Sequence, residues 1–121
     1  MSRTFNTYAA ETGEVLDGEF TIASAADAAI TVDKSEAAFS EFSKTPAETR
    51  ANFLETIADE IEALGDKLIQ RASAESGLPN GRFMGERGRT TGQLRGFASV
   101  VREGSWVEAR NLPRACEPRG H

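Results

Sequence analysis

The residues of this sequence that could bind a ligand by charge lie between residues 81 and 102, where arginines are interspersed with glycines. The arginines considered are Arg82, Arg87, Arg89 and Arg95, and the glycines are Gly85, Gly88, Gly92 and Gly96. A guanidinium group presents a fork of donors that binds a carboxylate or a phosphate through two hydrogen bonds. The alternative is a solvated helix face on which the arginines pair with Glu86 and Glu103. Both interpretations remain open from these residues alone.

The segment from Gly81 to Arg102 is predicted to be a helix, because its apolar residues recur at steps of three and four. Each glycine inside an exposed helix costs up to about 1 kcal/mol relative to alanine. A helix with four of them is expected to need the close approach of another element or of a ligand. The glycines do not form a dinucleotide-binding fingerprint, because no strand precedes them and their spacing does not fit. Ser105 to Ala109 is predicted to be a short strand.

Charge is divided unevenly along the chain. Residues 1–80 hold 6 Lys/Arg and 15 Asp/Glu, a net of −9, whereas residues 81–121 hold 8 Arg and 4 Glu, a net of +4. The total of −5 disfavours general nucleic-acid binding. No apolar run approaches the roughly 20 residues that span a bilayer, and Met1 to Ala10 lacks the apolar centre of a signal peptide. We therefore expect neither a nucleic-acid nor a membrane partner.

Cysteine and histidine are too scarce to supply a metal site or a nucleophile. The single cysteine, Cys116, excludes an internal disulfide and favours the reducing cytoplasm as the compartment. The single histidine is His121, at the end of the chain. Nothing in the surrounding sequence would hold a Cys–His pair in a catalytic geometry. Composition and spacing alone predict a mainly helical domain without an active site of its own.

The most clearly marked helical stretch runs from Thr45 to Gly77. Thr45 is predicted to cap it, Pro46 to occupy its first position, and Gly77 to end it in the left-handed conformation. Gly65 is expected to interrupt the stretch, with a second short helix after it. Its predicted apolar face consists of Leu54, Ile57, Ala58, Ile61, Leu64 and Leu68.

An earlier helix is expected from about Ala25 to Ser43, started by a capping-box-like pair of Ser24 and Asp27. Its small residues should pack on the next helix, and the short loop before Thr45 predicts a helical hairpin.

Residues 4–20 carry the signals of a β-hairpin around a turn at residues 11–14. The predicted fold class is therefore α+β, mainly α. It comprises an N-terminal β-hairpin, a helical hairpin and a third long helix.

Several short motifs resemble the opening helices of the aldehyde dehydrogenase superfamily. They are Ala37-Ala38-Phe39, Thr45-Pro46-Ala47, Arg50-Ala51, Phe53-Leu54, Ile57-Ala58 and Glu75-x-Gly77-x-Pro79, together with the turn Glu11-Thr12-Gly13-Glu14-Val15-Leu16. The stretch from Gly85 to Arg95 (GERGRTTGQLR), followed by Val101 to Val107, is more specific. It resembles the α-ketoglutaric semialdehyde (2,5-dioxovalerate) dehydrogenase branch.

The likeness assigns residues 1–110 to the N-terminal segment of an aldehyde dehydrogenase domain. Residues 111–121 are predicted to be a divergent, disordered tail. The abrupt change at Asn111 resembles a truncated or frame-shifted gene product, a deliberately shortened chain or a natural short paralogue, and these three alternatives stay open.

The resemblance implies oxidation of an aldehyde by NADP or NAD, using a cysteine nucleophile, an asparagine and a glutamate base. Those motifs, and the cofactor-binding ones, are absent from this sequence, and Cys116 does not match the context of the nucleophile. The expected function is that of an N-terminal fragment of an enzyme that converts 2,5-dioxopentanoate to 2-oxoglutarate. The fragment is expected to be inactive and to bind no cofactor alone. The alternative is a stand-alone helical interaction module without catalysis.

The resemblance also implies that the helix from Gly81 to Arg102 borders the channel through which the aldehyde enters. The substrate of this branch carries a carboxylate, for which a guanidinium is the natural partner. Arg89 lies within one turn of Gly85 and Gly92, which leave room for a ligand. We predict Arg89 as the substrate-binding residue with Gln93 as its helper, and we assign no catalytic, cofactor-binding or metal-binding residue. Helix faces without their family partners predict marginal stability and self-association.

Overall fold

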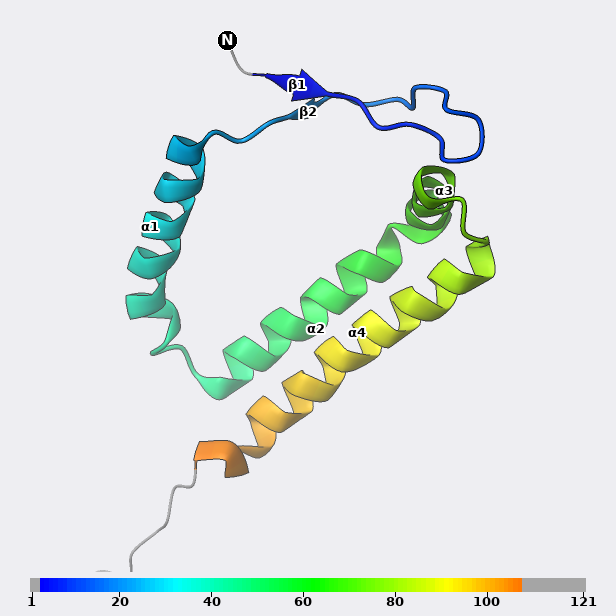
Figure 1. The fold of residues 1–121 in the computed structure, drawn as a ribbon. Coiled ribbons are helices and arrows are strands. Elements are labelled where there is room, and N and C mark those ends of the chain that lie inside the picture. Colours follow the sequence, from blue (N-terminus) through cyan, green and yellow to red (C-terminus); the bar gives the residue numbers. More distant parts are fainter. Residues whose placement is uncertain (1–2, 108–121) are drawn as a thin grey trace, which may run out of the picture.

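The structure is a computed structural model that describes residues 3–107. Its elements in chain order are β1 (Thr4–Phe5), β2 (Phe20–Thr21), α1 (Ala25–Phe42), α2 (Ala47–Ala63), α3 (Gly65–Ser76), α4 (Asn80–Glu103) and the 3-10 helix η1 (Ser105–Val107). The hairpin, α1 and the α2·α4 pair form an open frame, with α3 connecting the pair beneath the hairpin (Figure 1). The predicted class, α+β and mainly α with an N-terminal β-hairpin, is confirmed.

The hairpin is antiparallel, with Phe5 opposite Phe20 and their ring centroids 5.5 Å apart. Arg71 of α3 fastens the hairpin to the helices. Its Nη1 donates to the Asp17 carbonyl oxygen at 2.6 Å and its Nη2 to the Thr7 hydroxyl at 2.7 Å. The guanidinium also lies over the Phe20 ring, 6.0 Å from the centroid. One arginine therefore joins segments that are more than 50 residues apart in the sequence.

The predicted start of α1 is confirmed. The Asp27 backbone N–H donates to Ser24 Oγ at 3.2 Å, and the Ser24 N–H donates back to Asp27 Oδ2 at 2.8 Å. The hydrogen bond from the Ser24 backbone is the main cause that lowers the pKa of the Asp27 carboxyl. This reciprocal pair satisfies two N–H groups that the first turn of a helix leaves without partners.

The predicted packing of α1 on α2 is wrong. No residue of α1 is buried, and α1 turns away from α2 (Figure 1). The two helices contact each other near the loop that joins them, where the Phe42 and Phe53 rings lie edge to face with their centroids 6.0 Å apart. Pro46, in the extended conformation with ψ of 148°, redirects the chain at this point. The small residues of α2 pack against α4, not against α1.

Two local predictions also need correction. Thr45 does not cap α2, because its hydroxyl donates backward to the Phe42 carbonyl oxygen at 2.7 Å and Pro46 is the N-cap residue. Ser105 to Val107 form a 3-10 turn rather than the start of a strand. Residues 108–109 of that predicted strand, and the predicted tail at 111–121, lie outside the described residues.

The predicted breaks between the helices are confirmed. Gly65, with φ of +57°, begins α3 two residues after the end of α2, and Gly77, with φ of +74°, ends α3. Both φ values lie in the left-handed region that glycine adopts without strain.

Small residues bring α2 and α4 close together. Ala51 and Ala58 of α2 and Thr91 and Ala98 of α4 are all at most 1% exposed. Each pair is seven residues apart, two helical turns, so the contacts repeat along one line on each helix. The other buried apolar residue of the described part is Ile69 of α3. Close packing of helices here depends on small side chains rather than on a large apolar core.

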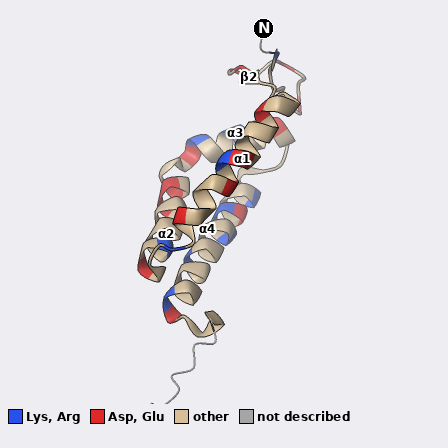
Figure 2. Ribbon diagram, turned by 90° about the vertical axis from the view of Figure 1, so that its left-hand side faces the viewer, with Lys and Arg blue, Asp and Glu red and all other residues tan. Residues whose placement is uncertain are grey.

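Ion pairs bridge one side of this helix pair. Arg95 binds Asp59 at 2.7 Å and Glu62 at 2.8 Å, and Arg102 binds Glu55 at 2.6 Å and Glu48 at 3.0 Å. Figure 2 marks these charges along α2 and α4. Hydrogen bonding by Arg95 lowers the pKa of the Glu62 carboxyl to about 2. Within residues 3–107, no helix combines the length and apolar character needed to cross a membrane.

Candidate functional site

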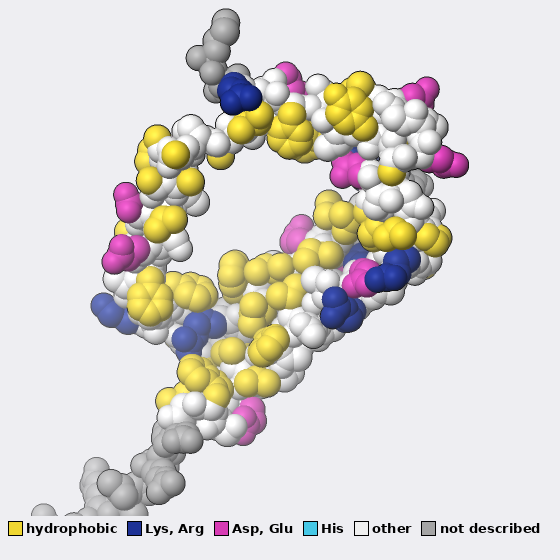
Figure 3. Space-filling model, viewed as in Figure 1, with side chains coloured by type: hydrophobic (Ala, Val, Ile, Leu, Met, Phe, Trp, Pro, Cys, Tyr) yellow, Lys and Arg dark blue, Asp and Glu magenta, His cyan; other side chains and the backbone are white. Residues whose placement is uncertain are grey.

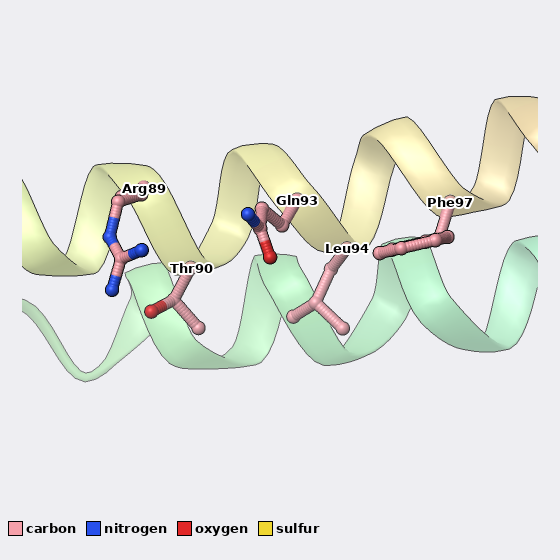
Figure 4. Close-up of a pocket in the computed structure, with 5 residues that line it drawn as sticks. All are labelled: Arg89, Thr90, Gln93, Leu94 and Phe97. Carbon is pink, nitrogen blue, oxygen red and sulfur yellow. The ribbon is translucent and has the colours of Figure 1, made fainter.

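A hollow of about 270 Å³ lies along α4 and contains both residues that the sequence predicted for the substrate. It is lined by Arg89, Thr90, Gln93, Leu94 and Phe97. Arg89, Gln93 and Phe97 follow one another at steps of four, so they form one row along the helix surface. Thr90 and Leu94 lie on the side of that row that faces α2 (Figure 4).

The hollow changes in chemical character along its length. Arg89 places a cation at one end, Phe97 places an aromatic ring at the other, and the Gln93 amide lies between them (Figure 4). The Arg89 side chain is 72% exposed. This arrangement suits a short molecule with an anionic end and an apolar body. Charge-assisted hydrogen bonds to the anion would be stronger than neutral ones.

In this structure the Arg89 guanidinium pairs with the carboxylate of Glu86, which lies one turn before it on α4. Its Nε and Nη2 lie 3.4 and 3.3 Å from Glu86 Oε2, whereas no hydrogen bond from Nη1 is found within residues 3–107. Glu86 also binds Arg82, at 3.2 Å. The hydrogen bond from Arg82 is the largest cause that lowers the pKa of the Glu86 carboxyl, followed by the charge of Arg89. Glu86 therefore keeps an ion-pair partner if Arg89 turns to a ligand.

The remaining arginines of the sequence analysis have other neighbours. Arg87 donates to the Gly65 carbonyl oxygen at 3.1 Å, and Arg95 belongs to the ion pairs between α2 and α4. Arg82 pairs with Glu86, as the solvated-face alternative expected, but it does not line the hollow. Glu103 binds the hydroxyl of Ser105. Among the four, Arg89 alone lines the hollow.

The sequence analysis missed the interhelical role of Arg95 and Arg102. The signal was present, since these arginines are seven residues apart and so are Glu48, Glu55 and Glu62. Matching seven-residue spacings on two helices predict a ladder of contacts along one side. It also missed Thr90, Leu94 and Phe97 as lining residues. Their steps of three and four residues along α4, shared with Gln93, were a signal that could have found them.

The glycines of α4 face open space. A Cβ built on Gly85, Gly88, Gly92 or Gly96 meets no atom within 4 Å. The expected close approach of another element is therefore not made by any part of residues 3–107. The glycines lie inside one continuous helix, where their N–H groups take part in helical hydrogen bonds. These N–H groups are therefore not free to cradle a phosphate as a glycine-rich loop at a helix N-terminus does.

Two comparisons relate this chain to known proteins. A family model described as the aldehyde dehydrogenase family matches residues 1–116. The chain is 52% identical over 98 residues to alpha-ketoglutaric semialdehyde dehydrogenase 2 of Azospirillum brasilense, a match that covers 80% of this chain and 19% of that protein. It is 49% identical over 73 residues to alpha-ketoglutaric semialdehyde dehydrogenase of Acinetobacter baylyi, covering 60% of this chain and 14% of that protein. The matched part of the chain thus spans less than a fifth of the length of each of these relatives. With nearly its whole length matched by the family model, the chain belongs to the aldehyde dehydrogenase family.

Proposed function

We propose that this chain is the N-terminal part of an NAD(P)-dependent aldehyde dehydrogenase that oxidises 2,5-dioxopentanoate to 2-oxoglutarate, with Arg89 as the ligand of the substrate carboxylate. The observation that carries the proposal is the position of Arg89 at the charged end of a hollow whose other end is apolar. The names of the two relatives, which are 52% and 49% identical to this chain over the matched residues, support the choice of a carboxylated semialdehyde.

The two ends of the hollow would bind different parts of the substrate. The guanidinium of Arg89 pairs with the carboxylate, and such charge-assisted hydrogen bonds contribute roughly 1.5–3 kcal/mol. Gln93 lies one turn further along α4 and can donate its amide N–H to a substrate oxygen. Leu94 and Phe97 offer apolar surface to the carbon chain. Arg89 would leave an exposed ion pair with Glu86, and pairs of this kind contribute little to stability.

The proposal assigns the reaction itself to parts of the enzyme that this chain does not contain. The sequence has no match to the family's cofactor-binding motifs or to its nucleophile segment. The chain alone is therefore expected to bind neither NADP nor NAD and to catalyse nothing. Its contribution would be to position the far end of the substrate.

Two assays test the proposal. The purified chain, mixed with 2,5-dioxopentanoate and NADP or NAD, should produce no reduced nicotinamide; turnover would contradict the proposal. In a chimera, the 98 matched residues of this chain replace those of the Azospirillum relative. The chimera should oxidise the carboxylated semialdehyde in preference to an uncharged aldehyde of equal length. A folded but inactive chimera would instead favour the stand-alone interaction module.

A further inference from the structure

The cation at the charged end of the hollow has an acidic neighbour that binds two arginines at once. Glu86 Oε2 lies 3.3 Å from Arg89 Nη2, while Glu86 Oε1 accepts from Arg82 Nε at 3.2 Å. Each oxygen of this carboxylate therefore has its own guanidinium. In Figure 3 basic and acidic side chains lie together over the first part of α4, beside hydrophobic side chains of the helix pair. An anion that approaches Arg89 meets the Glu86 carboxylate as a competitor.

Glu86 stays ionised and held in place when Arg89 turns toward a ligand. The hydrogen bond from Arg82 is the largest cause that lowers the pKa of the Glu86 carboxyl, and Arg82 does not line the hollow. The Glu86 side chain is 39% exposed, against 72% for Arg89, so the carboxylate is the more confined member of the pair. Since Arg82 and Glu86 are one turn apart on α4, a ligand in the hollow leaves their contact intact.

The repulsion between Glu86 and a ligand depends on the charge of the ligand. Coulomb energy is proportional to the product of the two charges, so a dianion is repelled about twice as strongly as a monoanion at the same distance. An anion hydrogen-bonded to the Arg89 guanidinium lies on the order of 6 Å from the Glu86 carboxylate, within the Debye length of about 8 Å. In water, removal of a unit charge at that distance changes the binding constant of a monoanion about threefold and that of a dianion about tenfold.

The charge of Arg82 does not cancel this repulsion. Arg82 lies seven residues before Arg89, which is about 10 Å along the helix axis, so its charge is largely screened at the ligand. Its effect is to hold the Glu86 carboxylate beside the hollow.

We propose that Glu86 is a specificity-determining residue of the hollow, because it competes for Arg89 and so favours a single carboxylate over a dianionic group such as a terminal phosphate. The inference rests on the proposed binding of a substrate carboxylate by Arg89. Glu86 does not line the hollow, so its role concerns the charge of the ligand and not the reaction. A semialdehyde with one carboxylate fits this charge, and an aldehyde with a terminal phosphate does not.

The test compares three inhibitors in a full-length homologue that carries the stretch from Gly85 to Arg95. Hexanoate, pentyl phosphate and hexanamide share a pentyl chain and differ in the charge of the head group. Inhibition constants against 2,5-dioxopentanoate are measured at constant low ionic strength and about pH 8, where a phosphate monoester carries close to two charges. Glu86→Gln should lower the constant about threefold for hexanoate and about tenfold for pentyl phosphate. The constant for hexanamide should not change.

Two further variants separate the position of the charge from its mere presence. Glu103→Gln removes the same charge from the same helix, but Glu103 binds the Ser105 hydroxyl and lies seventeen residues, about 25 Å, from Glu86. It should leave all three constants unchanged, since that distance exceeds the Debye length. Glu86→Asp keeps the charge and should preserve the wild-type ratio of the phosphate and hexanoate constants. Both substitutions of Glu86 replace a partly exposed side chain, so the variants should fold.

Three outcomes would overturn the inference. Equal changes for hexanoate and pentyl phosphate in Glu86→Gln would show that the residue does not discriminate charge. Weaker binding of hexanoate by Glu86→Gln would mean that Glu86 positions Arg89 for its ligand. A change in Glu103→Gln as large as that in Glu86→Gln would assign the effect to net charge.

Failure of this inference is distinguishable from failure of the proposed function. If Arg89→Ala weakens hexanoate but Glu86→Gln leaves the ratio of the two constants unchanged, Arg89 binds the carboxylate and Glu86 does not select it. If Arg89→Ala leaves hexanoate binding unchanged, the carboxylate binds elsewhere and both proposals are wrong.

Discussion

Replacement of Gly92 by alanine is expected to stabilise this chain. Gly92 lies in the middle of α4 and outside the left-handed region, and a Cβ built there meets no atom within 4 Å. An alanine methyl group therefore fits without moving any residue among 3–107. Alanine also restricts the unfolded chain more than glycine does, so folding loses less backbone entropy.

The expected gain is about 0.5–1 kcal/mol in the free energy of unfolding, the usual difference between glycine and alanine in a helix interior. For a domain of roughly 100 residues, 1 kcal/mol shifts the melting temperature by about 4–8 °C. Gly92→Ala should therefore raise the melting temperature by about 2–8 °C. Gly85 and Gly88 have the same open surroundings, so Gly85→Ala and Gly88→Ala should add similar increments.

Gly77→Ala provides the opposite control. Gly77 ends α3 with φ of +74°, and a Cβ there would lie 3.5 Å from that of Ala10. Alanine in the left-handed conformation costs about 1–2 kcal/mol, so this variant should melt at a lower temperature. Thermal unfolding followed by circular dichroism compares the variants under identical conditions. If Gly92→Ala lowers the melting temperature as Gly77→Ala does, the open glycine face is not a property of the isolated chain.

Three further predictions concern the α2·α4 pair. Ala58→Leu should lower the free energy of unfolding by about 1–3 kcal/mol, because the larger side chain forces the helices apart. Ala63→Leu, at the exposed end of α2, should change it by less than about 0.5 kcal/mol. Equal urea midpoints for the two variants would contradict the close packing of α2 on α4. The pKa of Glu62 is lowered from its ordinary 4.5 to about 2, so its stabilising contribution is complete above pH 4.5 and is lost as the pH falls toward 2. The difference in melting temperature between wild type and Glu62→Gln should accordingly shrink over that range, and a difference that does not vary with pH would exclude the ion pair as its cause. With a core of three alanines, one threonine and Ile69 in the described part, the isolated chain should melt over a broad range; a sharp two-state transition at low protein concentration would show otherwise.

Local signals in the sequence predicted the ends of the helices well. Ser24 with Asp27, and the two glycines at 65 and 77, act through hydrogen bonds and backbone angles that a few neighbouring residues determine. Thr45 does not cap α2, because its hydroxyl donates to the Phe42 carbonyl oxygen in the preceding helix. A capping motif predicts an available hydrogen bond, and a competing acceptor nearby can take the donor.

The partners of the helices were harder to predict than their boundaries. Periodicity showed that α2 has an apolar face, but it did not show that the buried line would be Ala51 and Ala58 against α4. The row of Arg89 and Gln93 follows from a spacing of four residues and was predictable. Phe97 continues the same row at the next step of four residues, so its place in the hollow was predictable as well. Whether the row binds a substrate stays a prediction.

Arg89 is the residue on which the proposed function depends most, and steady-state kinetics of a full-length homologue with this helix motif test its role directly. Arg89→Ala should raise KM for 2,5-dioxopentanoate by about one to two orders of magnitude, equivalent to a charge-assisted pair of roughly 1.5–3 kcal/mol. KM for an uncharged aldehyde of equal length should stay nearly constant. Arg82→Ala is the matched control, because Arg82 pairs with the same Glu86 outside the hollow, and it should change neither value. Equal losses on both aldehydes in Arg89→Ala would mean that Arg89 has a structural role and that the carboxylate binds elsewhere.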